Sequence, residues 1–191
     1  MILLGSQSPR RRELLAGLDI EFECVKIECE ESFSDTLKGA EIPLYLAELK
    51  ANAYNHKLGH DDVLITADTI VWLDGRVFGK PKNESEACEM LRTLSGKEHE
   101  VITGVCITTA KERRTFSVTS KVRFGHLSES EINHYVRKYC PLDKAGAYGI
   151  QEWIGYVGVE RIEGSYYNVM GLPVQRLYKE LVSMGIIKSE D

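Results

Sequence analysis

The stretch Leu64-Ile65-Thr66-Ala67-Asp68-Thr69-Ile70-Val71 places one carboxylate in the middle of an apolar, β-branched run. Such a run is typical of buried strand structure, and it predicts strands over residues 63–66 and 70–73. An ionised carboxylate in such surroundings is costly unless a cation, a metal ion or hydrogen-bond donors meet it. Two interpretations of Asp68 follow: a turn residue between two short strands, or a functional group with a charged partner.

Strand-like and helix-like runs alternate on both sides of this stretch, which favours an α/β fold with α+β character. The Asp74-Gly75 pair predicts a hairpin turn, so the strand after it returns antiparallel and the sheet is mixed. The patterns predict further strands over residues 2–4, 22–27, 101–109, 116–124 and 156–162. They predict helices over residues 9–16, 42–53 and 177–184, and helices that open at Asn83 and Ser128.

The bulk properties are those of one globular domain. With 191 residues, the chain is long enough to bury a substantial core. A net charge of −5 argues against a nucleic-acid partner, because phosphate backbones bind positive surfaces. No signal peptide or apolar run of membrane-spanning length is visible, so we expect a cytoplasmic protein with no membrane partner. The five cysteines lack metal-site spacing and predict free thiols.

The segment Ser6-Gln7-Ser8-Pro9-Arg10-Arg11 joins the first predicted strand to the first predicted helix. A helix N-terminus offers free N–H groups and a partial positive charge. Hydroxyl donors and arginine forks suit phosphate oxygens. The segment therefore predicts either an anion site or a capped surface helix with solvated arginines.

Three other charged segments are candidates for the same chemistry. Glu30-Glu31 follows a predicted strand and is either a solvated acidic turn or, if Glu31 meets Asp68, one side of a Mg²⁺ site. Lys80 follows a strand and is a candidate for phosphate or leaving-group binding. Lys50 lies at the edge of an apolar helix stripe, where a lysine whose stem covers apolar surface is commonplace.

Two glycine-rich segments, residues 145–151 and 164–173, suit either turns or close approach of the backbone to a ligand. The first ends in Gln151, whose amide could read the edge of a base. No Walker motif, dinucleotide fingerprint, G-x-S-x-G or H-E-x-x-H pattern occurs.

Short segments spread over nearly the whole chain form an ordered set. They are Ser6-Gln7-Ser8-Pro9-Arg10-Arg11, Glu31, Lys50-Ala51, Ala67-Asp68-Thr69, Gly79-Lys80-Pro81, Leu94-Ser95-Gly96, Thr103-Gly104-Val105, Asp143-Lys144-Ala145-Gly146-Ala147-Tyr148-Gly149-Ile150-Gln151 and Gly171-Leu172-Pro173. Each is weak alone, but in this order they resemble the Maf family of nucleotide pyrophosphatases.

The resemblance implies a single elongated domain over residues 1–191, with a mixed, twisted sheet flanked by helices and a deep nucleotide-binding cleft. It also implies hydrolysis of a nucleoside triphosphate between the α and β phosphates, which yields monophosphate and pyrophosphate and removes non-canonical or surplus nucleotides. A divalent cation, Mg²⁺ or Mn²⁺, is the implied cofactor. The implied site has Asp68 as general base and metal ligand, Glu31 as metal ligand, and phosphate-binding residues Ser8, Arg11, Lys50 and Lys80.

Three positions resemble the branch of the family that acts on dTTP and UTP: Arg10, Thr69 and Gln151. A sister branch that acts on 7-methyl-GTP carries Trp, Gln and Glu at these places. The chain departs from the family pattern at Gly5, where Ala is usual, and at Glu152, where Gly is usual. Glu152 puts a bulkier, negative side chain beside the implied base-reading residue.

The alternative function is a nucleotide-binding regulator of cell division with little turnover, since the family was first linked to septum formation. The combination of Asp68, Glu31 and Lys80 favours the enzyme, because a pure binder needs no general base. An RNA-binding module is disfavoured by the net charge and by the lack of interleaved basic and aromatic residues. The implied partner is a small nucleotide substrate, and a homodimer is one option for the oligomeric state.

Overall fold

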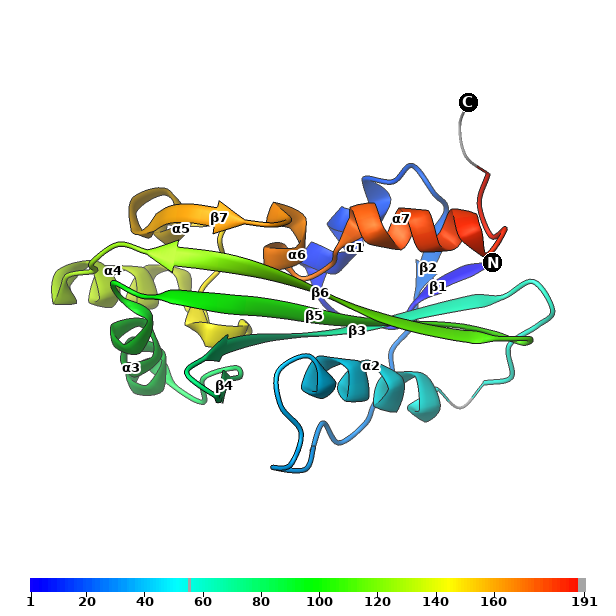
Figure 1. The fold of residues 1–191 in the computed structure, drawn as a ribbon, viewed down its shortest axis with the longest axis horizontal. Helices are drawn as coiled ribbons and strands as arrows, with labels where there is room; N and C mark the ends of the chain where they lie inside the picture. The colour runs from blue at the N-terminus through cyan, green and yellow to red at the C-terminus, as the bar shows by residue number, and fades with distance from the viewer. Residues whose placement is uncertain (55, 189–191) are drawn as a thin grey trace. The chain divides into compact units, whose positions relative to one another are not determined.

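The computed structural model describes residues 1–54 and 56–188 of the chain. Its strands form a mixed sheet in the order β2-β1-β3-β5-β6-β7, with β4 pairing with β3 (Figure 1). Strand β1 (Ile2–Leu4) is parallel to β2 (Phe22–Cys24) and to β3 (Val63–Leu73). In contrast, β4 (Arg76–Phe78) is antiparallel to β3. The predicted α/β fold with a mixed sheet is therefore confirmed.

The residues pack into two compact units. The first contains Met1–Asp68, Thr103–Val118 and the chain from Gly171 onward, and the second contains Thr69–Ile102 and Thr119–Met170. Three long strands, namely β3, β5 (Glu98–Thr109) and β6 (Arg113–Phe124), contribute residues to both. A single domain over residues 1–191 and a nucleotide-binding cleft stay predictions.

In the first unit, helices flank the sheet on both faces. Helix α2 (Glu41–Ala53) lies on one face, and α1 (Pro9–Ala16) and α7 (Val174–Ser183) lie on the other (Figure 1). Helix α1 begins where the sequence predicts, with Ser8 as N-cap and proline as its first residue. Small residues of α2, Ala47 and Ala51, pack on the apolar side chains of β1 and β3.

The second unit has the larger apolar core, which buries side chains of α3 (Glu84–Leu94) and α4 (Glu129–Tyr139). The two helices pack against each other, and Ser128 and Glu131 form the predicted capping box of α4. The Asp74-Gly75 turn is confirmed, since both residues have the positive φ, 52° and 76°, of a tight hairpin. The remaining elements are η1 (Ala145–Ala147), α5 (Trp153–Gly158), β7 (Val159–Glu163) and α6 (Tyr166–Met170).

Three sequence predictions of secondary structure are wrong, and the first is the strand expected over residues 22–27, which ends at Cys24. Residues 63–66 and 70–73 are not separate strands, because β3 continues through Asp68 without a turn. The strand expected over residues 156–162 begins only at Val159, because its first three residues complete helix α5. In the described part of the chain, no helix is long and apolar enough to cross a membrane.

Gly104 lets α2 approach strand β5 closely. A Cβ at this position would lie 2.4 Å from the carbonyl carbon and oxygen of Pro43, which belongs to the first turn of α2. We therefore expect Gly104→Ala to lower the free energy of unfolding by about 1–3 kcal/mol, through overpacking against rigid backbone. Urea denaturation measures this change. Gly17→Ala, whose Cβ would come no closer than 3.4 Å to a neighbour, is the control, and an equal loss in both variants would contradict the argument.

His99 is a structural residue of the second unit. It is buried, its Nε2 lies 2.7 Å from the Tyr148 hydroxyl oxygen, and burial lowers its pKa from 6.5 to about 4. Between these values the unfolded chain binds a proton that the folded chain does not. The free energy of unfolding should therefore fall by up to about 3 kcal/mol as the pH drops from 6.5 to 4. Urea denaturation across this range should show a shallower pH dependence in His99→Gln, and identical profiles would contradict the assignment.

Candidate active site

Asp68 lies inside strand β3 rather than in a turn, and only 8% of the residue is exposed. Its charge is met by Lys50 from helix α2, whose Nζ lies 2.7 Å from Asp68 Oδ1. The lysine side chain is 12% exposed, and its ammonium also lies 3.5 Å from the carbonyl oxygen of Ala67. Of the two interpretations of Asp68, the structure thus matches the one with a charged partner.

Glu31 completes a cluster of three charges. Its Oε2 lies 3.3 Å from Lys50 Nζ, and its side chain is 44% exposed. One ammonium group is therefore shared by a buried and a more accessible carboxylate. The pKa of the neighbouring Cys29 thiol is raised by burial and, next, by the negative charge of Glu31.

The carboxylates of Glu31 and Asp68, which both contact the Lys50 ammonium, are of the ligand type that a divalent cation prefers. No group of three or more His, Cys, Asp or Glu side chains that could hold a metal occurs among residues 1–54 and 56–188. Two carboxylates nevertheless converge on one positive charge here. Mg²⁺ is commonly held by one or two carboxylates, with water and substrate phosphates as its other ligands.

The N-terminal turn of α1 is tied to the same region through Arg11. Its Nε donates a hydrogen bond to the carbonyl oxygen of Gly171 at 2.8 Å, and its Nη1 donates to that of Ala67 at 2.9 Å. Ser8 Oγ accepts from the Arg11 backbone N–H. Burial lowers the pKa of Arg11, whereas the negative charge of Asp68 raises it. Arg11 is therefore a cross-link within the first unit as well as a candidate phosphate ligand, and Arg10 precedes it on α1.

Three predicted site residues, Thr69, Lys80 and Gln151, belong to the second unit. Thr69 follows Asp68 in β3, and Lys80 is exposed after β4. The segments around Lys80 and Gln151 are linked, because the Gly146 N–H donates to the carbonyl oxygen of Gly79 at 3.1 Å. Among the described residues, the buried side-chain oxygen of Gln151 has no hydrogen-bond partner. Such an acceptor is costly unless a ligand supplies the donor.

Beside Gln151 lies a charged cluster that the sequence analysis did not predict. Lys144 Nζ contacts carboxylate oxygens of Asp143 at 2.9 Å and of Glu152 at 3.1 Å, and the lysine side chain is only 9% exposed. The hydroxyl of buried Tyr135 donates to Glu152 Oε2 at 2.5 Å. The available sequence signal was the Asp143-Lys144 pair together with the unusual Glu152.

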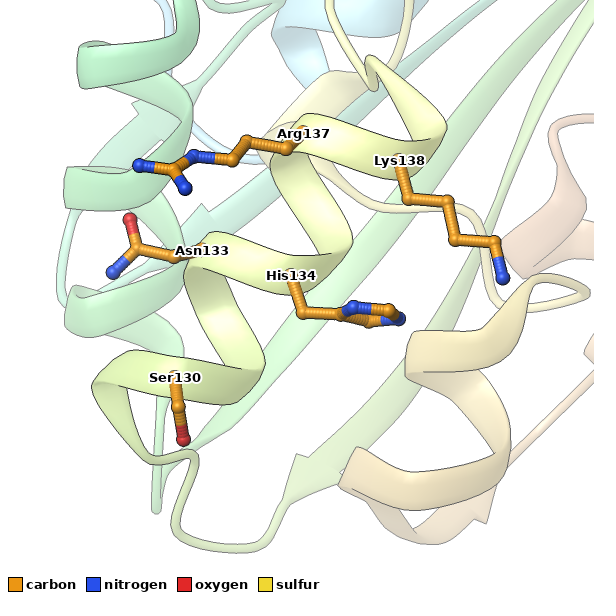
Figure 2. A pocket seen from close by; sticks show the side chains of 5 residues that line it. All are labelled: Ser130, Asn133, His134, Arg137 and Lys138. Atoms are coloured by element: carbon orange, nitrogen blue, oxygen red, sulfur yellow. The ribbon is translucent and has the colours of Figure 1, made fainter.

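A hollow of about 500 Å³ lies along α4 and is lined by Ser130, Asn133, His134, Arg137 and Lys138. Figure 2 shows Asn133 and Arg137 pointing to the side of α4 that faces α3, whereas His134 and Lys138 point the other way. The His134 ring packs edge-on against Trp153, with the ring centroids 4.9 Å apart. No residue predicted for the active site lines this hollow, so we assign it no part in the site.

The fold and the site define an α/β protein with an acidic, lysine-centred candidate active site. The model of the family described as "Maf-like protein" matches residues 1–184, and the chain belongs to this family. The family resemblance seen in the sequence is thereby confirmed.

Curated relatives match this chain over almost their full length. A protein of Phocaeicola vulgatus named "dTTP/UTP pyrophosphatase" is 60% identical over 181 residues, which is 94% of each chain. A protein with the same name from Parabacteroides distasonis is 59% identical, and the alignment covers 94% of each chain. One from Flavobacterium psychrophilum is 47% identical, and the alignment covers 95% of this chain and 93% of that protein. Among solved structures, the Staphylococcus aureus Ham1 protein is similar with a TM-score of 0.43 and 15% identity, over 64% of this chain and 71% of that chain.

Proposed function

We propose that this protein is a nucleoside triphosphate pyrophosphatase that hydrolyses dTTP and UTP to the monophosphate and pyrophosphate. The observation that carries the reaction type is the buried carboxylate of Asp68, held by Lys50 in the middle of a strand. The choice of substrate is supported by relatives named "dTTP/UTP pyrophosphatase" that match 94% of the chain. Removal of non-canonical or surplus nucleotides in the cytoplasm would be its role.

In the proposed reaction, Asp68 accepts a proton from the attacking water. The water oxygen forms a bond to the α-phosphorus as the bond from that phosphorus to the α–β bridging oxygen breaks, and pyrophosphate leaves with that oxygen. Lys50 holds the carboxylate in place through the 2.7 Å contact between its Nζ and Asp68 Oδ1. A general base must come within hydrogen-bond reach of the proton that it takes.

The remaining charged residues have roles in binding. Glu31 and Asp68 would hold a divalent cation, Mg²⁺ or Mn²⁺, and Ser8, Arg11, Lys50 and Lys80 would bind phosphate oxygens. When bound, the cation polarises phosphoryl oxygens and offsets the charge that develops on pyrophosphate.

Gln151 is the proposed base-reading residue, with Arg10 and Thr69 shaping the specificity pocket. Thymine and uracil each present an N3–H donor between two carbonyl acceptors. The buried side-chain oxygen of Gln151, which has no hydrogen-bond partner within residues 1–54 and 56–188, can accept from such a donor, and the NH₂ group of Gln151 can donate to a neighbouring carbonyl. A site built on hydrogen bonds rejects a mismatched base because its own polar groups would stay unpaired.

We expect kcat/KM for dTTP and UTP to exceed that for GTP, ATP and 7-methyl-GTP by at least about tenfold, which corresponds to roughly 1.4 kcal/mol of transition-state discrimination. Gln151→Glu should erode this preference, because an ionised carboxylate accepts hydrogen bonds but does not donate them. Steady-state kinetics with the nucleotide panel and Mg²⁺ measure the effect, with Gln175→Glu on the exposed face of α7 as control. Equal values for purines and pyrimidines in the unmodified protein would refute the substrate choice.

The alternative, a nucleotide-binding regulator of cell division with little turnover, is not favoured. A binder gains nothing from a buried aspartate that needs a lysine to compensate its charge, because this arrangement costs desolvation energy. Turnover in the nucleotide panel separates the two, since a regulator would bind dTTP and leave it intact.

A further inference from the structure

The carboxylate of Glu152 is fully engaged inside the second unit. Its Oε1 lies 3.1 Å from Lys144 Nζ, and its Oε2 accepts a hydrogen bond from the Tyr135 hydroxyl. Glu152 is the N-cap residue of α5, yet its side chain makes no capping hydrogen bond. The side chain is therefore directed to Lys144 and Tyr135 instead of to the helix that it precedes.

These contacts hold both ends of the turn that carries Gln151. The Tyr135 hydroxyl accepts a hydrogen bond from the Gly149 N–H at 3.0 Å while it donates to Glu152. The backbone closes the same turn, because the Glu152 N–H donates to the carbonyl oxygen of Gly149 at 3.0 Å. One hydroxyl thus links the first and last residues of a four-residue turn, and Gln151 is the third.

The turn is also packed tightly against the charged pair. A Cβ at Gly149 would lie 2.9 Å from Lys144 Cε and 3.1 Å from Glu152 Cδ, so the glycine backbone touches both side chains. Tyr135 stays protonated as the donor, because burial and, next, its hydrogen bond to Glu152 raise its pKa. The cluster can therefore shift only if several buried contacts break together.

A buried ion pair is a weak source of stability, because desolvation offsets much of the attraction between its charges. What such a pair supplies is a defined geometry. Here the geometry is that of the turn next to Gln151, whose side-chain oxygen is buried and without a hydrogen-bond partner among the described residues.

We propose that Glu152 is a positioning residue for base selection: with Lys144 and Tyr135 it fixes the turn from Gly149, and so holds the Gln151 amide in the orientation that receives the pyrimidine. This inference rests on the proposed function. Glu152 does not touch the nucleotide, and its carboxylate is paired with Lys144.

The first test is a mutant cycle on base preference. We compare kcat and KM for UTP and GTP in the unmodified protein, Glu152→Gly, Gln151→Ala and the double variant. The ratio of kcat/KM for UTP to that for GTP should fall at least about threefold in Glu152→Gly, since even a 1 Å misplacement can cost up to roughly 10²-fold. In the Gln151→Ala background, Glu152→Gly should change the ratio no further, because Glu152 acts through Gln151.

Two additional variants keep this test decisive. Glu152→Gln can retain one of the two contacts but not both, so its preference should lie between those of the unmodified protein and Glu152→Gly, even if the glycine variant folds poorly. Glu160→Gln removes an exposed carboxylate of the same unit, 3.8 Å from Arg123, and should leave the ratio unchanged. An unchanged ratio in both Glu152 variants, or an equal further loss in the Gln151→Ala background, overturns the inference.

The second test does not depend on turnover. The side-chain amide signals of Gln151 in ¹H–¹⁵N spectra, assigned by their loss in Gln151→Ala, should be sharp in the unmodified protein and should broaden or shift in Glu152→Gly. Unaltered signals overturn the positioning role, whatever the enzyme hydrolyses. Altered signals in a protein without pyrimidine preference would instead refute the proposed substrate and leave the turn geometry standing.

Discussion

Asp68→Asn is expected to lower kcat for dTTP at least about 10²-fold, the lower range for removing a positioned acid–base group. Asparagine keeps the shape and the hydrogen-bonding oxygen of the side chain but cannot take a proton from water. Nucleotide affinity, measured by calorimetry, should fall less than kcat, because the proposed phosphate-binding residues are unchanged.

The control for this variant is Asp35→Asn, an exposed aspartate of the same unit, which should keep full activity. Thermal unfolding of both variants checks that the fold is intact. A near wild-type kcat in Asp68→Asn would show that the aspartate is only a structural partner of Lys50.

Lys50→Met is expected to lower the free energy of unfolding by about 3 kcal/mol, because it removes the ammonium group that contacts the buried Asp68 carboxylate. The methionine stem can fill the space of the lysine stem, so the loss reports on charge more than on packing. Urea denaturation at neutral pH measures it. The value lies at the lower end of the range for buried pairs because Glu31, the other carboxylate in contact with Lys50, is partly exposed and stays solvated when the lysine is removed.

Two further variants isolate the electrostatic part of this effect. Lys57→Met, at an exposed position, should change stability by less than about 0.5 kcal/mol. The double variant Lys50→Met, Asp68→Asn should regain part of the loss, since the unpaired charge is gone. Equal destabilisation by the single and the double variant would mean that the 2.7 Å contact contributes little.

The sequence predicted the elements around Asp68 better than the strand that contains it. Local patterns identify strands and helix caps, so the positions of α1, α2 and β4 were predicted closely. A charged residue breaks an apolar pattern, and β3 was therefore divided into two short strands. The strand continues because Lys50, 18 residues earlier, supplies the compensating charge, and a partner at that separation leaves no local pattern.

Prediction of the candidate site from the sequence is limited in the same way. Glu31, Lys50, Asp68 and Arg11 were predicted as site residues, and the structure brings them together within the first unit. The cluster of Lys144, Glu152 and Tyr135 was not predicted, because each residue alone is typical of a surface or of a core. Only the fold places a tyrosine of α4 against a turn that begins 14 residues later.

The central claim is hydrolysis between the α and β phosphates, and its most direct test is to follow the products of dTTP in ¹⁸O-labelled water with Mg²⁺. We expect dTMP and pyrophosphate in equal amounts, with the label in dTMP, because water attacks the α-phosphorus. Label in pyrophosphate would place the attack at the β-phosphorus instead, and release of dTDP and orthophosphate would contradict the claim.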